Sequence, residues 1–292
     1  MTRPLPIRDE DIAAYRRDGA AVLRGVLDAD ALALIEAGCE EAWATRGTRH
    51  SLVRDTEGRG ETLVEQYPAQ HCPGFAALIA SGVPGQIAGR VMGTPSAQLV
   101  LDQVFYKTPG RIVPTPWHQD TPFLRVRGFD LVRVWLCCDP SPADLTVEVV
   151  RGSHRWNVVF NTRTEAQSEL TSELGGTLSH DNIGDGYLPL VPDVARYRDS
   201  YDVIGFDVSP GDALVFHGNI LHAARGREDW PHPRRAFASL WGGPALRYHR
   251  PEGKAFPAPG DAGDIPDDAP IGSHEDAFPV GWRADAAQTI PA

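Results

Sequence analysis

The pattern of apolar and polar positions changes character near residue 96. Before that point, apolar residues recur at three- and four-residue steps, as on one face of a helix. Asp9 and Asp28 are suited to cap two helices, and a further helix is expected from Gly74 to Met92. The polar stretch from Arg46 to Gly60 is expected to form a loop. We therefore expect a largely helical part over residues 1–95.

From Gln98 onward, apolar residues alternate with polar ones, which is the pattern of half-buried strands. Runs rich in Gly, Pro, Asn and Asp separate these stretches and indicate turns. The expected strands are Gln98–Lys107, Thr115–Asp120, Leu131–Cys138, Thr146–Val150, Val203–Val208, Ala213–Phe216, Ile220–Arg225 and Arg235–Trp241. About eight short antiparallel strands with flanking helices predict a mainly β fold, a double-stranded β-helix of the jelly-roll or cupin-like type.

The length of the chain favours one domain. At 292 residues and 31.8 kDa it can bury one sizeable core, because β-barrels and sandwiches of about 200–250 residues commonly form a single domain. We expect a single domain over 1–292, with the jelly-roll core at 96–245 and an irregular tail at 246–292. The segment at 155–201 breaks the strand rhythm, and such long insertions are usually lids or binding loops.

Net charge and cysteine content limit which binding partners and which cellular compartment are expected. The net charge of −11 and the pI near 5.3 argue against nucleic acid or an anionic membrane as a partner. The N-terminus has no apolar signal region, and no stretch approaches the roughly 18 apolar residues of a membrane span. The four cysteines form no C-x-x-C pair, which fits a reducing cytoplasm. We expect a cytoplasmic monomer or homodimer.

Candidate chemistry lies in the sequence Trp-His-Gln-Asp that ends at Asp120. Side chains two residues apart on a strand point to the same face, so His118 and Asp120 are expected to coordinate one metal ion. A third ligand from elsewhere would complete two histidines and a carboxylate on one face of an octahedron, which suits a non-haem Fe(II). His217 and His222 lie in one predicted hairpin, and both are candidates for that ligand.

Several pieces of the chain resemble, in order and spacing, the phytanoyl-CoA dioxygenase branch of the Fe(II)/2-oxoglutarate-dependent oxygenases. The matching pieces are Asp18–Leu27, Lys107–Gly110, Trp117–Asp120, Val134–Leu136, Arg151–His154, Pro210–His222 and Arg234–Ala236. Together they cover about residues 10 to 245. The chain departs from the family pattern after Asp139 and at Arg151, where a proline is frequent; both changes lie away from the expected metal site.

The resemblance implies the roles of the site residues. It places Fe(II) on His118, Asp120 and His222 as the catalytic and metal-binding set, and leaves His217 as a packing or supporting histidine. It also implies 2-oxoglutarate as cosubstrate and O2 as oxidant. Halogenating relatives have a small residue in place of the carboxylate, so Asp120 argues for oxygenation.

The distal carboxylate of 2-oxoglutarate is best held by a guanidinium fork. The resemblance puts this anchor at Arg234, and strand parity agrees, because Arg234 shares a face with the small residues Ala236 and Ala238. Arg235 remains the alternative anchor. On the same resemblance, Gln103 and Trp135 are candidates to contact the cosubstrate.

The expected function is oxidation of a C–H bond, by default hydroxylation, in a small-molecule substrate such as a metabolite or natural-product intermediate. Desaturation, ring closure and epimerisation start from the same hydrogen abstraction. Nothing resembles a phosphate cradle for coenzyme A, so an acyl-CoA ranks below these substrates. Two alternatives stay open: a cupin-like metal-dependent isomerase or lyase without 2-oxoglutarate, and a non-catalytic binding barrel.

Overall fold

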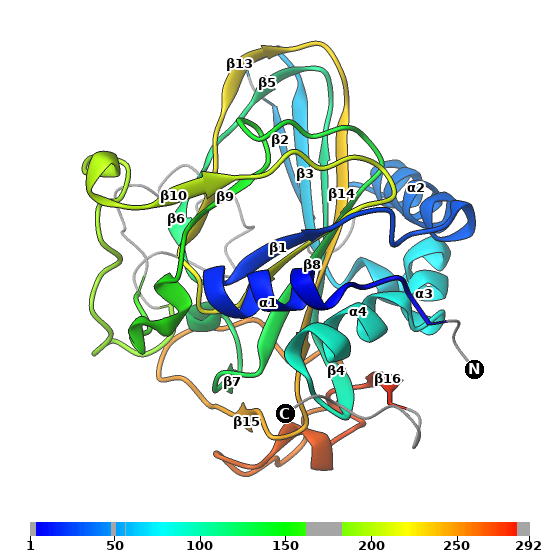
Figure 1. Ribbon diagram of the computed structural model, residues 1–292. Coiled ribbons are helices and arrows are strands. Elements are labelled where there is room, and N and C mark those ends of the chain that lie inside the picture. The colour runs from blue at the N-terminus through cyan, green and yellow to red at the C-terminus, as the bar shows by residue number, and fades with distance from the viewer. Residues whose placement is uncertain (1–3, 48–50, 56, 162–182, 285–292) are drawn as a thin grey trace.

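The computed structural model describes residues 4–47, 51–55, 57–161 and 183–284 (Figure 1). Its centre is an eight-stranded antiparallel sheet in the order β1-β11-β8-β14-β4-β3-β2, with β16 paired to β4 off this path. The strands are β1 (Ala20–Leu23), β11 (Ala213–His217), β8 (Leu131–Cys137), β14 (Arg234–Gly242), β4 (Ser96–Lys107), β3 (Glu61–Gln66), β2 (Ser51–Asp55) and β16 (Val280–Arg283).

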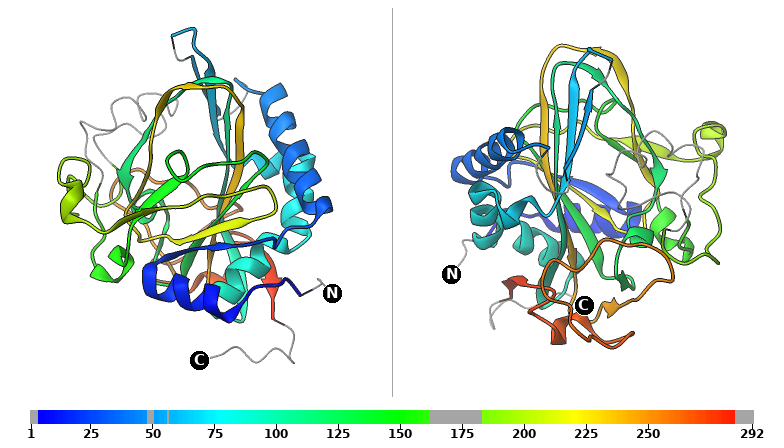
Figure 2. Two further views of the ribbon diagram at one scale, coloured as in Figure 1. Left: turned by 45° about the horizontal axis from the view of Figure 1, so that its top comes forward. Right: turned by 180° about the vertical axis from the view of Figure 1, so that it is seen from behind.

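A smaller four-stranded sheet has the order β10-β9-β12-β6 and lies opposite the inner face of the large sheet (Figures 1 and 2). Its strands are β10 (Val203–Gly205), β9 (Val147–Val150), β12 (His222–Ala224) and β6 (Thr115–His118). Two ribbons complete the β structure: β5 (Gly110–Ile112) with β13 (Arg227–Trp230), and β7 (Val126–Arg127) with β15 (Arg247–Tyr248). The two facing antiparallel sheets confirm the predicted double-stranded β-helix.

Helices cover the outer face of the large sheet (Figure 2). They are α1 (Asp9–Asp18), α2 (Ala29–Ala44), α3 (Pro73–Ala80) and α4 (Val83–Met92). The Asp28 side chain caps α2 by accepting a hydrogen bond from the Ala31 N–H, whereas Asp9 is the first residue of α1 and not its cap. The single helix expected over 74–92 is two, because Gly82 adopts a left-handed conformation with Pro84 directly after Val83.

Alternation along each central strand separates the main core from the space between the sheets. In β8, Val132 and Val134 pack with the helices, whereas Trp135 and Cys137 belong to a second cluster between the sheets. In β14, Phe237 joins the helical core, and Ala236 and Ala238 face inward. Because the inward residues of β14 are small, a cavity remains over the large sheet.

Two expectations for the ends of the chain were wrong. The stretch expected as a loop contains β2, which pairs with β3 as a hairpin at the edge of the large sheet, so the first 95 residues are not only helical. The tail expected to be irregular contributes β15 and β16. Part of the expected insertion, residues 162–182, lies outside the described residues, and the expected single-domain organisation stays a prediction.

Candidate active site

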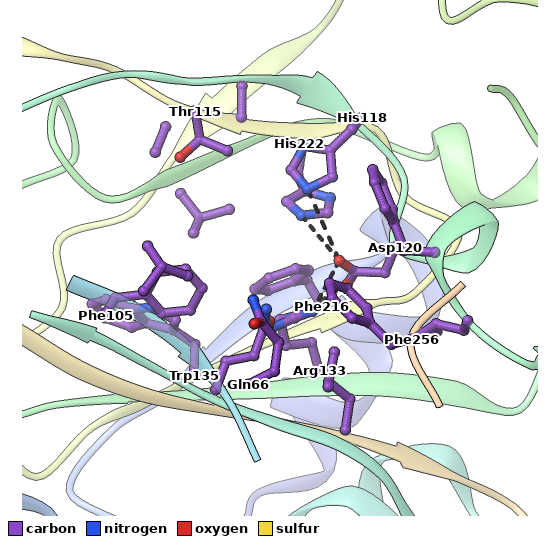
Figure 3. A pocket seen from close by; sticks show the side chains of 18 of the residues that line it. Gln66, Phe105, Thr115, His118, Asp120, Arg133, Trp135, Phe216, His222 and Phe256 are labelled. Carbon is purple, nitrogen blue, oxygen red and sulfur yellow. Dashed lines mark hydrogen bonds and ion pairs between the residues drawn. The ribbon is translucent and has the colours of Figure 1, made fainter. Parts of the chain in front are cut away.

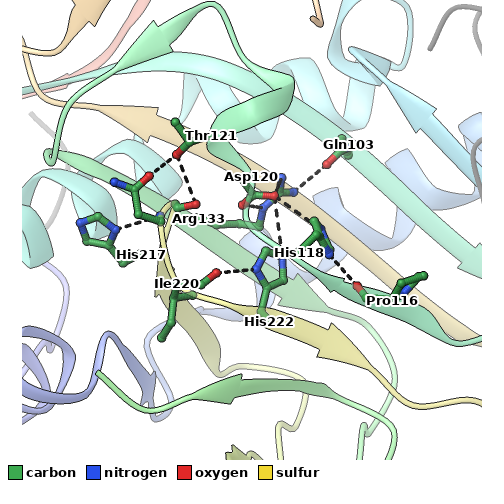
Figure 4. Close-up of polar contacts among 11 residues, drawn as sticks. Gln103, Pro116, His118, Asp120, Thr121, Arg133, His217, Ile220 and His222 are labelled. Carbon is green, nitrogen blue, oxygen red and sulfur yellow. Dashed lines mark hydrogen bonds and ion pairs between the residues drawn. The ribbon is translucent and has the colours of Figure 1, made fainter. Parts of the chain in front are cut away.

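Three side chains converge where β6 meets β12 in the smaller sheet (Figure 4). His118 ends β6 and is the register partner of His222, the first residue of β12. The Asp120 Oδ1 atom lies 4.0 Å from His118 Nε2 and 3.7 Å from His222 Nε2. Within the described ranges, this is the only group of three metal-ligating side chains with its ligand atoms within 4.8 Å of one another. The sequence therefore identified a real cluster.

The reason given for that cluster was partly wrong. Strand β6 ends at His118, and Asp120 has a helical backbone with φ −73° and ψ −36° at the start of the short 3-10 helix Thr121–Phe123. The two side chains meet because the chain turns after the strand, and not because both lie on one strand face. The Asp120 N–H donates to the Gly218 carbonyl at 3.0 Å, which ties the turn to the loop before His222.

Both histidines direct their Nε2 atom to the place where a metal ion would lie. His118 Nδ1 lies 2.8 Å from the Pro116 carbonyl, and His222 Nδ1 lies 3.1 Å from the Ile220 carbonyl (Figure 4). A carbonyl can only accept, so each Nδ1 carries the proton and each Nε2 lone pair is directed to the cluster. A hydrogen bond from the other ring nitrogen is the usual support of a metal-binding histidine. The donor set therefore fits a divalent metal ion.

Burial sets the charge state of this cluster. Desolvation lowers the pKa of His118, and desolvation together with the neighbouring His118 ring lowers the pKa of His222 to about 3. Burial alone would raise the pKa of Asp120, but the Arg133 guanidinium and the His222 ring hold it below its usual value. The cluster thus offers two neutral imidazoles and one carboxylate, the protonation states that metal binding requires.

Arg133 is a site residue that the sequence analysis missed. It projects inward from β8, and its Nε and one terminal nitrogen each donate to an Asp120 oxygen at 2.9 Å. Its other terminal nitrogen donates to the Gln103 Oε1 at 2.6 Å (Figure 4). The Arg133 and Asp120 side chains are each only 7% exposed. The available signal was a single arginine in an apolar strand, with the same parity as Trp135.

His217 lies outside the cluster. It ends β11 on the outer side of the large sheet, where its ring packs against Tyr15, Phe129 and His154. Its Nδ1 accepts a hydrogen bond from the Asn219 N–H at 3.0 Å. The structure therefore places His217 as a packing residue and His222 beside Asp120.

The two candidate arginines point in opposite directions. Arg234 is buried in the cavity, where its Nε donates to Ser141 Oγ at 3.1 Å and its guanidinium lies 5.7 Å from the centre of the Trp135 ring. Arg235 lies on the outer face and forms ion pairs with Asp139 at 2.9 Å and Glu40 at 2.8 Å. Strand parity thus predicted the orientation of both. Only Arg234 is placed to bind a ligand of the cavity.

Lys107 is a second buried basic residue, next to Arg234 on the neighbouring strand β4 but outside the cavity lining, and the sequence analysis gave it no role. It is the register partner of Arg234, is buried, and donates from Nζ to the Val113 carbonyl at 3.1 Å. Burial and the Arg234 charge lower the pKa of Lys107 well below its usual value, and burial lowers the pKa of Arg234 to about 10. Neither residue pairs with a carboxylate in the described part of the chain, so Arg234 and Lys107, called the anion site below, are candidates to bind an anion.

One cavity is lined both by Arg234 and by the three residues of the His-Asp-His cluster. Figure 3 shows the cluster side chains at the edge of this cavity. Trp135 lines it near Arg234, and Gln103 lines it near Arg133. Most of the other walls are apolar, which keeps water from competing with polar contacts inside. The apolar lining residues include Val64, Leu101, Phe105, Phe123, Leu124, Val147, Phe216 and Phe256.

Comparison with known proteins agrees with this geometry. The family model for phytanoyl-CoA dioxygenase (PhyH) matches residues 15–236. The chain is 22% identical over 265 residues to the ectoine dioxygenase of Sphingopyxis alaskensis, and the match covers 88% of this chain and 83% of that protein. The family match spans every residue of the cluster and both cations of the anion site.

Solved structures share the fold at low sequence identity. The alpha-ketoglutarate-dependent carbocyclase SnoK from nogalamycin biosynthesis is 17% identical with a TM-score of 0.68, covering 94% of this chain and 96% of that chain. The epimerase SnoN, solved with Fe3+, alpha-ketoglutarate and nogalamycin RO, is 17% identical with a TM-score of 0.65, covering 94% and 98%. In the described part of this chain, no helix is both long and apolar enough to cross a membrane.

Proposed function

The chain belongs to the phytanoyl-CoA dioxygenase family, and on this premise we propose that His118, Asp120 and His222 hold the Fe(II) of a 2-oxoglutarate-dependent dioxygenase. Family membership confirms the enzyme class expected from the sequence, with Fe(II), 2-oxoglutarate and O2 as its cofactors. The observation that carries the residue assignment is that one cavity is lined by a His-Asp-His cluster and by the buried Arg234, which has Lys107 beside it and no carboxylate partner among the described residues.

Bound iron, with 2-oxoglutarate and O2, supplies the oxidative decarboxylation that yields succinate and carbon dioxide and oxidises a substrate C–H bond. The protein supplies the geometry. Arg133 fixes the Asp120 carboxylate, and the carbonyls of Pro116 and Ile220 fix the two imidazole rings. These contacts hold the three donor atoms in place before a metal arrives.

Arg234 and Lys107 are proposed to hold the distal carboxylate of 2-oxoglutarate. Two buried cations can neutralise a carboxylate that is itself removed from water, and the guanidinium can form a bidentate contact. Trp135, beside Arg234, would limit the space for this end of the cosubstrate. Gln103 is less suited to the same ligand, because its carbonyl oxygen already accepts from Arg133.

We propose a small metabolite or natural-product intermediate as the substrate and hydroxylation as the default outcome. The similar proteins are named as an ectoine dioxygenase, a carbocyclase and an epimerase, so related sites direct one oxidation to different products. A cupin-like isomerase and a binding barrel do not need a buried cation pair, and the Arg234–Lys107 pair favours the oxygenase. The proposal includes a monomer or homodimer and a cytoplasmic location; the location is supported by four free cysteines, of which Cys39, Cys72 and Cys137 are buried.

The assignment is tested by succinate formation from 2-oxoglutarate in the presence of Fe(II) and O2. The assay measures succinate released from 2-oxoglutarate alone, so it does not require the substrate to be identified. We expect His222→Ala to abolish succinate release and His217→Ala to retain it, because only His222 lies in the cluster. Equal rates in the wild type and His222→Ala would refute the assignment.

A further inference from the structure

The cavity extends beyond the metal and cosubstrate positions to β3, at the side of the large sheet away from β8 (Figure 3). Gln66 on β3 is the register partner of Gln103 on β4, and both line the cavity. Directly opposed residues on antiparallel strands share a face, with Cβ atoms about 5 Å apart. Two amide side chains therefore stand next to each other on the cavity floor.

This pair is well separated from the anion site. Gln103 is four residues along β4 from Lys107, about 13 Å at the usual rise of a strand. Gln66 lies one strand further from β8, which carries Arg133 and Trp135. A cosubstrate held by Arg234 and Lys107 would thus leave the Gln66 end of the cavity free for the substrate.

Gln66 has an unused hydrogen-bonding group. Its Nε2 atom is buried and has no hydrogen-bond partner in the described part of the structure. Figure 3 shows the Gln66 side chain directed into the cavity between the metal-binding cluster and Phe105. Leaving a buried amide N–H unpaired costs about 1–3 kcal/mol, so a bound ligand that accepts from it is favoured. The complementary ligand group is an oxygen that accepts a hydrogen bond.

The charge of this end of the cavity restricts the rest of the ligand. Arg133 is the nearest cation of the lining, and its guanidinium is already occupied by both oxygens of Asp120 and by Gln103. No other cation among the described lining residues lies outside the anion site. An anionic substrate group beside Gln66 would therefore be buried without a free side-chain cation to pair with, at a large desolvation cost. The surrounding walls are apolar: Val64, Leu101, Phe123, Leu124 and Phe256.

We propose that Gln66 is a substrate-binding residue that selects a neutral, mainly apolar molecule carrying an acceptor oxygen, such as a ring ketone. This inference rests on the proposed function, which assigns the opposite end of the cavity to 2-oxoglutarate. The Gln103 carbonyl oxygen accepts a hydrogen bond from Arg133, so the Gln103 amide nitrogen points away from Arg133. We infer that this nitrogen assists Gln66 in binding the substrate. A zwitterion or carboxylate is disfavoured here by the lack of an available cation.

The test uses full-length protein loaded with Zn(II) and 2-oxoglutarate, which binds ligands without turnover. Three probes of similar size are compared by ligand-detected NMR: acetophenone as the neutral ketone, ethylbenzene as its hydrocarbon analogue and benzoate as the anion. We expect acetophenone to bind at least about fivefold more tightly than either analogue, the effect of one added hydrogen bond. Gln66→Met should remove this preference, and Gln66→Asn should reduce it.

Gln70→Leu is the matched control, because Gln70 is exposed, lies outside the cavity lining, and its side-chain amide donates to the Pro259 carbonyl. Binding of 2-oxoglutarate to each variant shows that the cavity is intact. If 2-oxoglutarate binds but benzoate is preferred, if acetophenone does not bind at millimolar concentration, or if Gln66→Met keeps the ketone preference, the Gln66 proposal is wrong. Failure of the wild type to bind 2-oxoglutarate would instead refute the proposed function.

Discussion

Arg133 donates to both carboxylate oxygens of Asp120 in a buried ion pair, with both contacts at 2.9 Å. The same Asp120 Oδ1 that faces the two histidines accepts one of these bonds, and Oδ2 accepts the other. Oδ1 is the Asp120 oxygen that lies near both histidine Nε2 atoms, so it is the oxygen that would hold a metal ion together with them. Arg133 fixes the carboxylate in this orientation.

We expect Arg133→Met to destabilise the metal-free protein by about 3–5 kcal/mol, because it leaves the buried Asp120 charge unpaired. A bound divalent metal would compensate that charge. The increase in melting temperature on adding Mn(II) should therefore be larger in Arg133→Met than in the wild type, by roughly 2–4 °C for each kcal/mol restored. Equal increases, measured by thermal denaturation with and without Mn(II), would show that Arg133 does not act through the metal site.

The burial of Lys107 predicts proton uptake when 2-oxoglutarate binds. Desolvation and the Arg234 charge lower its pKa, and a bound carboxylate would raise it again. In calorimetry above neutral pH, the binding enthalpy should depend on the ionisation enthalpy of the buffer in the direction of uptake. Lys107→Met should lose this dependence and weaken binding by about tenfold, which is 1.4 kcal/mol. A wild-type enthalpy that is the same in all buffers would exclude this role.

Arg234 and Arg235 provide a matched pair of substitutions on one strand. Arg234→Met should raise the dissociation constant of 2-oxoglutarate by about 100-fold, within the range for removing one partner of a buried charge pair. Arg235→Met should leave that constant unchanged and cost about 2–3 kcal/mol of stability, because it removes a largely buried contact with Asp139 and a more exposed one with Glu40. The reverse result in a 2-oxoglutarate titration would assign the anchor to Arg235.

Sequence periodicity was sufficient for the central strands but not for the edges. Strand parity separated Arg234 from Arg235 correctly, because the two faces of 234–242 are buried against distinct partners. The β2–β3 hairpin was missed because Ser51–Asp55 has only two apolar residues, Leu52 and Val53, which are adjacent and do not alternate with polar ones. It is held by register pairing with β3, which in turn pairs with β4. Such pairing depends on distant residues and leaves no local pattern.

The site shows the same limit. His118, Asp120 and His222 were found from local spacing and family motifs, although Asp120 reaches the cluster through a turn and not along the strand. Arg133 and Lys107 were not assigned, because their roles arise from Asp120 and Arg234, which lie on other elements. Both are charged residues at inward-facing positions of apolar strands, and this feature of the sequence would have identified them as candidates.

His217 makes a prediction for acid stability. Burial and the neighbouring His154 lower its pKa from 6.5 to about 3, so the folded state binds a proton less readily than the unfolded state. The neutral His217 therefore contributes to the free energy of unfolding above pH 6.5, and this contribution is lost as the pH falls towards 3. His217→Gln removes this titration, so the stability advantage of the wild type should shrink by about 1–3 kcal/mol between neutral pH and pH 4. Denaturant unfolding of the wild type and His217→Gln at several pH values measures this difference in stability. If the stabilities of the two proteins change in parallel with pH, the burial argument is wrong.

The central claim is that His118, Asp120 and His222 hold Fe(II) within reach of a 2-oxoglutarate bound at Arg234. It is tested most directly by adding 2-oxoglutarate to Fe(II)-loaded protein without oxygen and recording the weak visible charge-transfer absorption that chelation of the keto acid produces. The account predicts this absorption in the wild type, its absence in His222→Ala, and a shift of its appearance to higher 2-oxoglutarate concentration in Arg234→Met. Iron that is bound by the wild type but gives no absorption at saturating 2-oxoglutarate would contradict the claim.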